Sequence, residues 1–203
     1  MIYPPRPEDC IPPDMDLKWI KTWHCQLKHN DTRTVIHIDT KETKIYNRHK
    51  EPMRKHHISD QLTSAIQTIK EKLGLTHDSI LDGGLLGDSL LILWDILRVN
   101  GKDQIGTTYQ QRHLALHRIS TEENIPHLGH YLAPGIYTPH NYTHEEKSLL
   151  WKLVSERNAT ENKIVLEGIV YKDPTATLEP MYKQKNNTTW MVKSRIQTGR
   201  HRF

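Results

Sequence analysis

The apolar residues of this chain are grouped at spacings that predict both helices and strands. The clearest pattern runs from residue 59 to residue 73, where apolar residues recur every three or four positions and so lie on one face of a helix. These residues are Leu62, Ala65, Ile66, Ile69 and Leu73. Ser59 or Asp60 can cap the start of this helix, and Gly74 is expected to end it.

Shorter runs of apolar and β-branched residues predict strands on both sides of this helix. Residues 34–39 and 44–48 flank a polar turn, so we expect them to pair as a hairpin. The other predicted strands are residues 17–20, 23–27, 79–81, 90–97, 164–171 and 188–193. Residues 127–132 fit either a strand or a loop.

Two further helices are predicted at residues 108–119 and 143–158. The second is expected to begin at Thr143 and to turn four apolar residues inward, namely Leu149, Leu150, Leu153 and Val154. Strand pairs separated by helices favour an α+β fold in which antiparallel sheets are covered by helices. The 203 residues are expected to form a single domain, and the prolines within residues 1–16 predict an extended lead-in over its surface.

The composition adds two constraints on compartment and partners. The net charge of +4, with 14 histidines, permits a polyanionic partner without requiring one. Cys10 and Cys25 are too few for a disulfide framework, which favours free thiols in a reducing compartment. No run approaches the roughly 20 apolar residues of a membrane span, and the proline-rich N-terminus does not fit a signal peptide. We therefore expect a soluble cytoplasmic protein.

Lys28 is a candidate nucleophile, because it is expected on a polar turn and Arg33 follows five positions later. Desolvation and a neighbouring cation lower the pKa of a lysine, and the neutral amine is nucleophilic. On its own, the same pattern is typical of a solvated surface lysine. The remainder of the chain decides between these two interpretations.

Five segments resemble, in order, the motifs of the nucleotidyltransferase core of ATP-dependent polynucleotide ligases, which mRNA capping enzymes share. KHNDTR at residues 28–33 resembles K-x-D-G-x-R, and YNR at 46–48 resembles the arginine-bearing strand that follows. DGG at 82–84 with LWDIL at 93–97 resembles D-G-E followed by F-D-I-L. EGIVYK at 167–172 resembles E-G-[IV]-V-x-K, and WMVKSR at 190–195 resembles W-x-x-K-x-K. The resemblance extends from Trp23 to Arg195, nearly the whole chain.

The resemblance implies an adenylation domain with an ATP-grasp-like fold that acts as a ligase. Within the family, the DNA ligase branch is the most similar, so the expected substrate is a DNA nick. Lys28 would attack the α-phosphate of ATP and carry AMP as a phosphoramidate. AMP would then pass to a 5′-phosphate end, and a 3′-hydroxyl would displace it. Each step is a phosphoryl-group transfer, so the protein mainly positions groups and neutralises charge.

The resemblance also implies roles for the residues around Lys28. Gln26 would read the adenine edge with Leu27 beside it, and Trp94 would stack on the base. Arg33 and Arg48 would hold the ribose or the end phosphate.

The remaining implied roles concern phosphate and metal. Lys172 and Lys193 would contact the α-phosphate, and Arg195 would keep the charge of the motif's second lysine. Glu167, together with Asp82, would hold Mg²⁺ or Mn²⁺, and Asp82 would also contact the nucleotide.

Three departures from the motifs affect what we expect. Asn30 and Asp31 stand where the family has Asp-Gly, and a glycine there would allow positive φ at low cost. Gly84 replaces a glutamate that holds a ribose hydroxyl, a contact that is lost unless Asp82 or a water replaces it. The chain ends soon after the last motif, so the family's OB domain is expected to be absent, to have been removed, or to be supplied in trans.

Two alternatives stay open. One is an RNA ligase or a capping-type guanylyltransferase, with Trp94 and Gln26 recognising a different base or strand. The other is a non-catalytic relative that binds nucleotides or nucleic-acid ends. Taken singly, Trp94 and Trp190 are typical core aromatics, whereas the carboxylate of Asp95, inside an apolar run, requires a partner or a metal.

Overall fold

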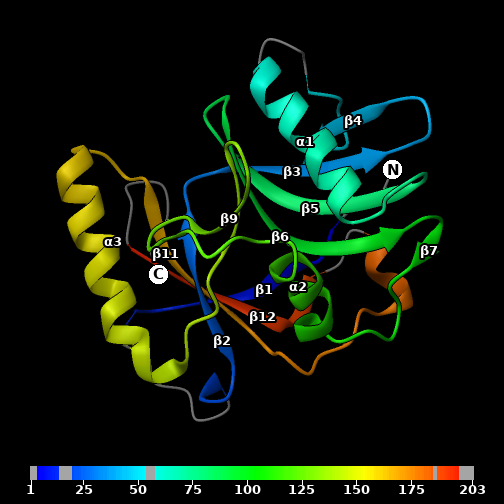
Figure 1. The fold of residues 1–203 in the computed structure, drawn as a ribbon. Coiled ribbons are helices and arrows are strands. Elements are labelled where there is room, and N and C mark those ends of the chain that lie inside the picture. Colours follow the sequence, from blue (N-terminus) through cyan, green and yellow to red (C-terminus); the bar gives the residue numbers. More distant parts are fainter. Residues whose placement is uncertain (1–3, 14–19, 54–57, 185–186, 197–203) are drawn as a thin grey trace.

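Two β-sheets with helices against them make up the protein (Figure 1). The computed structural model describes residues 4–13, 20–53, 58–184 and 187–196. The smaller sheet has the strand order β1 (Arg6–Ile11), β12 (Asn187–Arg195), β11 (Leu166–Lys172) and β2 (His24–His29). The larger sheet has the order β4 (Thr43–Asn47), β3 (Thr32–Ile38), β5 (Ser79–Leu86), β6 (Leu90–Val99), β10 (Ile136–Thr138), β9 (Gly129–Ala133) and β8 (Asn124–Ile125), with β7 (Lys102–Asp103) paired to β6.

The α+β prediction is confirmed, but the sheets are mixed rather than purely antiparallel. Each contains one parallel pair, β1 with β12 and β6 with β10. The proline-rich lead-in also differs from expectation, because Arg6–Ile11 forms an edge strand instead of lying over the surface. Prolines are tolerated at the start and edge of a sheet, where no ladder N–H is needed. The predicted strand at residues 17–20 falls mostly outside the described residues.

The chain passes from the smaller sheet to the larger one directly after Lys28. β2 ends at His29 and β3 begins at Thr32, so the two intervening residues, Asn30 and Asp31, link the sheets. Lys28 itself lies on strand β2 and not on the turn where the sequence placed it. The hairpin of β3 and β4 is confirmed, with Ile36 opposite Ile45.

Helix α1 (Asp60–Lys72) packs its apolar face on the larger sheet. The Ser59 hydroxyl accepts a hydrogen bond from the Leu62 N–H at 3.1 Å, and Gly74 follows the helix with φ +64°, as the sequence predicts. Leu62 and Ile69 are buried in a cluster that includes Leu93 of β6. This helix therefore covers the part of the sheet that lies away from Lys28.

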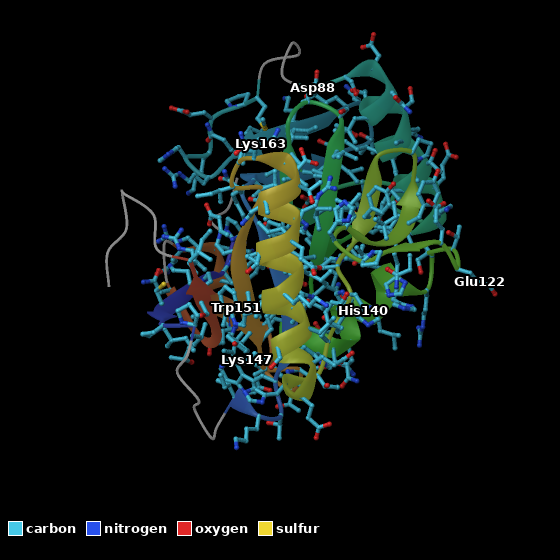
Figure 2. All side chains as sticks on the ribbon, turned by 90° about the vertical axis from the view of Figure 1, so that its left-hand side faces the viewer. Asp88, Glu122, His140, Lys147, Trp151 and Lys163 are labelled. Carbon is cyan, nitrogen blue, oxygen red and sulfur yellow. The ribbon has the colours of Figure 1, made fainter. Side chains whose placement is uncertain are left out.

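Helix α3 (Lys147–Glu161) packs on the smaller sheet after a 3-10 turn, His144–Glu146. Figure 2 shows it along the outside, with Lys147 near one end and Lys163 near the other. Leu150 and Val154 are buried, but Leu149 is 48% exposed, so its predicted inward orientation is wrong. Leu150, Val154 and the partly buried Leu153 form the inward face of the helix, and Leu149 lies at its edge.

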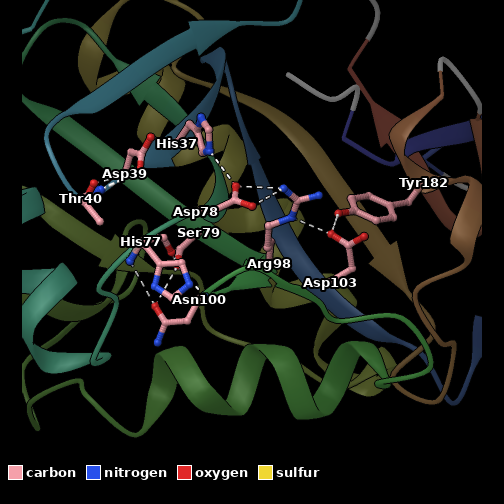
Figure 3. Close-up of polar contacts among 10 residues, drawn as sticks. All are labelled: His37, Asp39, Thr40, His77, Asp78, Ser79, Arg98, Asn100, Asp103 and Tyr182. Carbon is pink, nitrogen blue, oxygen red and sulfur yellow. Dashed lines mark hydrogen bonds and ion pairs between the residues drawn. The ribbon is translucent and has the colours of Figure 1, made fainter.

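The outer end of the larger sheet is closed by a polar network (Figure 3). Arg98 of β6 donates to Asp78 at 2.8 and 2.9 Å and to Asp103 of β7 at 2.7 Å. The Tyr182 hydroxyl, from the 3-10 turn Pro180–Lys183, donates to Asp103 at 2.8 Å. These contacts tie the segment before β12 to the β6–β7 hairpin.

No described helix is long and apolar enough to cross a membrane.

A buried ion pair joins helix α2 (Tyr109–His117) to β6. Arg112 donates to Asp95 through Nε at 2.7 Å and Nη2 at 3.1 Å, and both residues are only 3% exposed. The Ile96 N–H and the Thr107 carbonyl satisfy further polar atoms of the pair. This is the partner that a carboxylate inside the apolar run of β6 requires.

We expect Arg112→Met to lower the free energy of unfolding by about 3–5 kcal/mol, because it leaves the Asp95 carboxylate buried without its cation. The exposed pair of Lys152 with Glu156, at 3.7 Å on α3, provides the control. Lys152→Met should change stability by less than about 1 kcal/mol. Urea denaturation of both variants measures the difference, and similar losses in the two would contradict the assignment.

Candidate active site

A cavity of about 780 Å³ opens between the two sheets, at the point where the chain crosses from one to the other. Every residue that the sequence placed at the site lines it except Asp82; these are Gln26, Leu27, Lys28, Arg33, Arg48, Trp94, Glu167, Lys172, Lys193 and Arg195. They come from five strands and from the turn after β4, and they span more than 160 positions of sequence. The cavity thus collects side chains from all five motif segments.

Strand periodicity explains why these side chains meet. Gln26 and Lys28 are two residues apart on β2 and share one face, while Cys25 and Leu27 belong to the apolar cluster under α3. On β12, Met191, Lys193 and Arg195 line the cavity with the same period of two. Leu27 also lines the cavity, although its side chain belongs mainly to the apolar core.

The Lys28 ammonium forms an ion pair with Glu167, with Nζ 2.5 Å from Oε2. Glu167 is the extra residue of a β-bulge, because Leu166 pairs with His29 and Gly168 pairs with Lys28. A bulge changes the direction of a side chain locally, and here it brings the carboxylate to the lysine. Arg195 Nη1 lies 3.2 Å from the same oxygen.

Gly168 allows this bulge to pack against β12. Its φ is +148°, and a Cβ at this position would lie 2.1 Å from the Ser194 carbonyl oxygen. Only glycine can take this conformation at such a short distance. The Glu-Gly pair of the fourth motif segment is therefore required by the geometry that joins Glu167 to Lys28.

Lys172 lies buried in the floor of the cavity, 4% exposed. Burial lowers the pKa of its ammonium to about 7, against the opposing effect of Asp95 and Asp82. Its Nζ lies 4.5 Å from the ring centre of Tyr109 and 5.8 Å from that of Trp94. The site therefore holds a lysine whose charge depends on what enters the cavity. Lys193 also has a pKa lowered by burial.

Asp82 does not reach the cavity. It is 2% exposed, and both its oxygens are engaged by the Arg33 guanidinium, while Trp94 Nε1 donates to Oδ2 at 2.9 Å. Burial raises the pKa of its carboxyl, and Arg33 opposes that shift. Asp82 thus positions Arg33 and Trp94, whose guanidinium carbon and ring centre are 5.2 Å apart.

A chain of hydrogen bonds fixes the orientation of the Gln26 amide. The Pro139 carbonyl can only accept, so His113 Nε2, 3.0 Å away, must carry the proton. Burial lowers the pKa of His113 to about 3, so Nδ1 is unprotonated and accepts from Asn141 Nδ2 at 3.1 Å. Asn141 Oδ1 then accepts from Gln26 Nε2 at 2.6 Å.

Gln26 Nε2 also donates to the Tyr109 hydroxyl at 2.6 Å. Both amide protons are therefore used, and Gln26 Oε1 has no partner among the described residues. Because Gln26 lines the cavity, this carbonyl oxygen is a hydrogen-bond acceptor for whatever occupies it.

The link between the sheets does not have the strain that its sequence suggested. Neither Asn30 nor Asp31 is among the residues with positive φ. Asn30 is held by its side-chain donation to the Ile164 carbonyl at 2.9 Å and its N–H donation to Val165 at 3.0 Å. Asp31 lines the cavity next to Lys28.

The oxygen atoms that the cavity offers fit a divalent cation that is bound mainly by the phosphates of a substrate and only in part by the protein. Among the described residues, no group of three or more His, Cys, Asp or Glu side chains is arranged to hold a metal. Glu167 has one carboxylate oxygen in contact with Lys28 and Arg195, and its Oε1 has no hydrogen bond or ion pair with a described residue. One carboxylate combined with substrate phosphates is the way Mg²⁺ is commonly bound.

Several residues of the site could not be found from sequence. Tyr109, His113 and Asn141 belong to none of the five motif segments. Arg6 enters the cavity because the lead-in forms β1, an edge that proline composition concealed. Their roles depend on contacts between residues that are distant in sequence. Gln26, for example, is 83 positions from Tyr109 and 115 positions from Asn141.

The described architecture is similar to that of solved DNA ligases. Mycobacterial DNA ligase D complexed with ATP and MES matches 96% of this chain with a TM-score of 0.63 and 15% identity. The ligase domain of LigD from M. tuberculosis matches 94% with a TM-score of 0.61 and 15% identity. A Lig E DNA ligase, described as binding DNA with a minimal scaffold, matches 95% of this chain and 68% of its own chain, with a TM-score of 0.54 and 10% identity.

These similarities establish the fold of this chain as that of a DNA ligase adenylation domain. The chain spans about 60% of the length of each of the two LigD structures. No protein-family model matches the sequence, and no curated protein sequence matches it either.

We expect His113 to be the Nε2–H tautomer and to stay neutral throughout the range of about pH 5 to 8 in which an ordinary histidine titrates. Nitrogen-15 NMR of histidine-labelled protein, with His113 assigned from a His113→Gln variant, reads out the tautomer directly. Since the folded pKa is lowered from 6.5 to about 3, this histidine contributes stability at neutral pH that is lost as the pH falls below 6.5. Titration of folded His113 near pH 6.5 would contradict the hydrogen-bond order.

Proposed function

We propose that this chain is the adenylation unit of an ATP-dependent polynucleotide ligase, a single nucleotidyltransferase domain. The observation that carries the proposal is the position of Lys28. It lies at the junction of the two sheets, in one cavity with Gln26, Trp94 and a group of cations. The partners implied are ATP and a nicked duplex.

In the first step, Lys28 Nζ attacks the α-phosphorus of ATP. A nitrogen–phosphorus bond forms, the bond from that phosphorus to the bridging oxygen breaks, and pyrophosphate leaves with the bond electrons. Glu167 is in contact with Nζ and is placed to take the proton that the ammonium must lose. Lys172, Lys193 and Arg195 offset the charge that accumulates on the phosphoryl oxygens.

A divalent ion, Mg²⁺ or Mn²⁺, would be held by Glu167 with phosphate oxygens of ATP and would neutralise charge on the leaving pyrophosphate. In the two later steps, the oxygen of a 5′-phosphate end displaces Lys28 from AMP, and a 3′-hydroxyl displaces AMP from that end. Arg48 lies exposed on the rim, next to His49 at 3.0 Å, where an end phosphate would approach.

The fixed amide of Gln26 favours adenine over guanine. Its Oε1 is the free atom, and it accepts a hydrogen bond from the 6-amino group of adenine, whereas the 6-oxo group of guanine offers only another acceptor. A site that leaves a polar group unpaired discriminates strongly against the wrong ligand. This supports a ligase over a guanylyltransferase. RNA ends are the alternative substrate, and DNA nicks are preferred because the similar solved structures are DNA ligases.

Adenylylation is tested by incubating the protein with Mg²⁺, pyrophosphatase and α-labelled ATP or GTP. We expect a labelled adduct from ATP, stable on a denaturing gel, that disappears in Lys28→Ala and persists in the matched control Lys152→Ala, an exposed lysine of α3. Label from GTP alone would indicate a capping-type enzyme. No label from either nucleotide would identify a non-catalytic relative. The same adduct offered to nicked DNA and nicked RNA-containing duplexes then reports the substrate.

The affinity for ATP should fall as the pH rises above 7. In the empty cavity Lys172 loses its proton near pH 7, and bound phosphate would restore the charge, so binding above pH 7 takes up a proton. The expected loss is up to about tenfold per pH unit. Calorimetry with MgATP in buffers of different ionisation enthalpy measures the proton uptake. Lys172→Met should bind weakly with a flat profile, and an unchanged profile in that variant would refute the assignment.

A further inference from the structure

The carboxylate of Asp31 occupies the space directly above Gly84 of β5. A Cβ built on Gly84 would lie 2.5 Å from Asp31 Cγ and 2.7 and 2.8 Å from its two oxygens. No side chain at position 84 could coexist with Asp31 in this position. The two positions are therefore coupled, although they are 53 positions apart in sequence.

Asp31 is also the acidic group of the cavity that has no partner. Glu167 is paired with Lys28, and Asp82 is engaged by Arg33 and Trp94. Within the described residues, no donor lies within hydrogen-bonding distance of the Asp31 carboxylate. Burial raises the pKa of this carboxyl to about 6, although Lys28 and Arg33 act to lower it. A partly desolvated carboxylate without a donor is poorly satisfied until a ligand supplies one.

The position of Asp31 lies between the two ends of the site. On one side it follows Lys28 by three residues, where the α-phosphate must come. On the other side it lies over Gly84, which pairs with Ile92, and Trp94 is two residues further on the same strand face. The sugar of a nucleotide connects the α-phosphate to the base, so it must pass this point.

We propose that Asp31 accepts hydrogen bonds from the ribose hydroxyls of the bound nucleotide and that Gly84 provides the space for it to do so. The proposal rests on the proposed function, because it assumes that a nucleotide occupies the cavity. Phosphate is excluded as the partner by its charge, and the cations of the cavity are placed to take it. Asp82, which the sequence suggested as the substitute at this position, is already committed to Arg33 and Trp94.

The sequence departures at 31 and 84 then have one explanation. The resemblance predicts glycine at 31 and glutamate at 84, and this chain has aspartate at 31 and glycine at 84. The carboxylate and the glycine have exchanged positions between β5 and the link that precedes β3, whose Arg33 is opposite Gly84. One carboxylate is kept at this place in the cavity, and it approaches from the link between the sheets.

The direct test compares ATP with its 2′-deoxy and 3′-deoxy analogues, both in nucleotide binding by calorimetry and in Lys28 adduct formation. We expect the unaltered protein to prefer ATP over at least one analogue by about ten- to hundredfold, as for a hydrogen bond to a charged group. Asp31→Ala should lose that preference, with the KM for ATP raised to the analogue's value. Glu122→Ala serves as the matched control and should retain it, because Glu122 is exposed, does not line the cavity and lies at the edge of the molecule in Figure 2.

The exchange itself supplies a second test. Gly84→Glu alone should bind ATP poorly, because the new side chain meets the Asp31 carboxylate. The double variant Asp31→Gly, Gly84→Glu should regain both ATP affinity and ribose discrimination, giving a coupling between the two sites that independent positions would not show. Thermal unfolding of each variant separates misfolding from loss of contact. If Asp31→Ala fails to fold, Asp31→Asn, which keeps the shape of the side chain, replaces it.

Two outcomes would overturn the inference. Equal discrimination in Asp31→Ala and the unaltered protein would exclude contact with the ribose. A variant that changes only the Mg²⁺ dependence of adduct formation would make Asp31 a metal ligand instead. Either result, obtained while the Lys28 adduct still forms from ATP, leaves the proposed function intact. Absence of ATP binding by the unaltered protein would instead overturn both.

Discussion

The contact between Lys28 and Glu167 depends on the backbone of three different strands. β2 supplies the lysine at its last partly buried position before the chain leaves the sheet, and a bulge in β11 turns the carboxylate towards it. Gly168 lets β12 approach closely enough to place Arg195 on the same oxygen. Lys28 is thus held by sheet pairing rather than by a flexible turn, and positions built on strands are more precise than positions on loops.

The charges of the cavity are arranged so that cations remain available while most acids are neutralised internally. Asp82 is used to orient Arg33 and Trp94, and Asp95 is used to bury Arg112 next to the aromatic pair of Tyr109 and Trp190. Lys172 lies above the same tyrosine, with its pKa lowered by burial to about 7. Such a site gains favourable electrostatic energy when phosphates enter, because desolvated cations acquire counter-charges that the protein does not itself provide.

Local patterns were sufficient to predict much of this fold. The period of α1, its cap at Ser59 and the strands carrying the five motif segments depend on residues close together in sequence, and the structure confirms them. Features that depend on distant pairing escaped prediction. β1 is a strand only because β12 lies parallel to it, and the short strands β8 and β10 have too few residues to show a period. The parallel pairs that make both sheets mixed were missed for the same reason.

The cavity shows the same division more sharply. Gln26 could be assigned to the base from its place in a motif, but the direction of its amide is set by His113 and Asn141, which have no pattern of their own. In the sequence alone, Asp31 and Gly84 are two separate departures from the motifs. In three dimensions the side chain of one fills the space left by the other, so the informative unit is the pair. A departure from a motif is therefore a defect only when no neighbouring residue supplies the missing group, and that can be judged only once the sheets are paired.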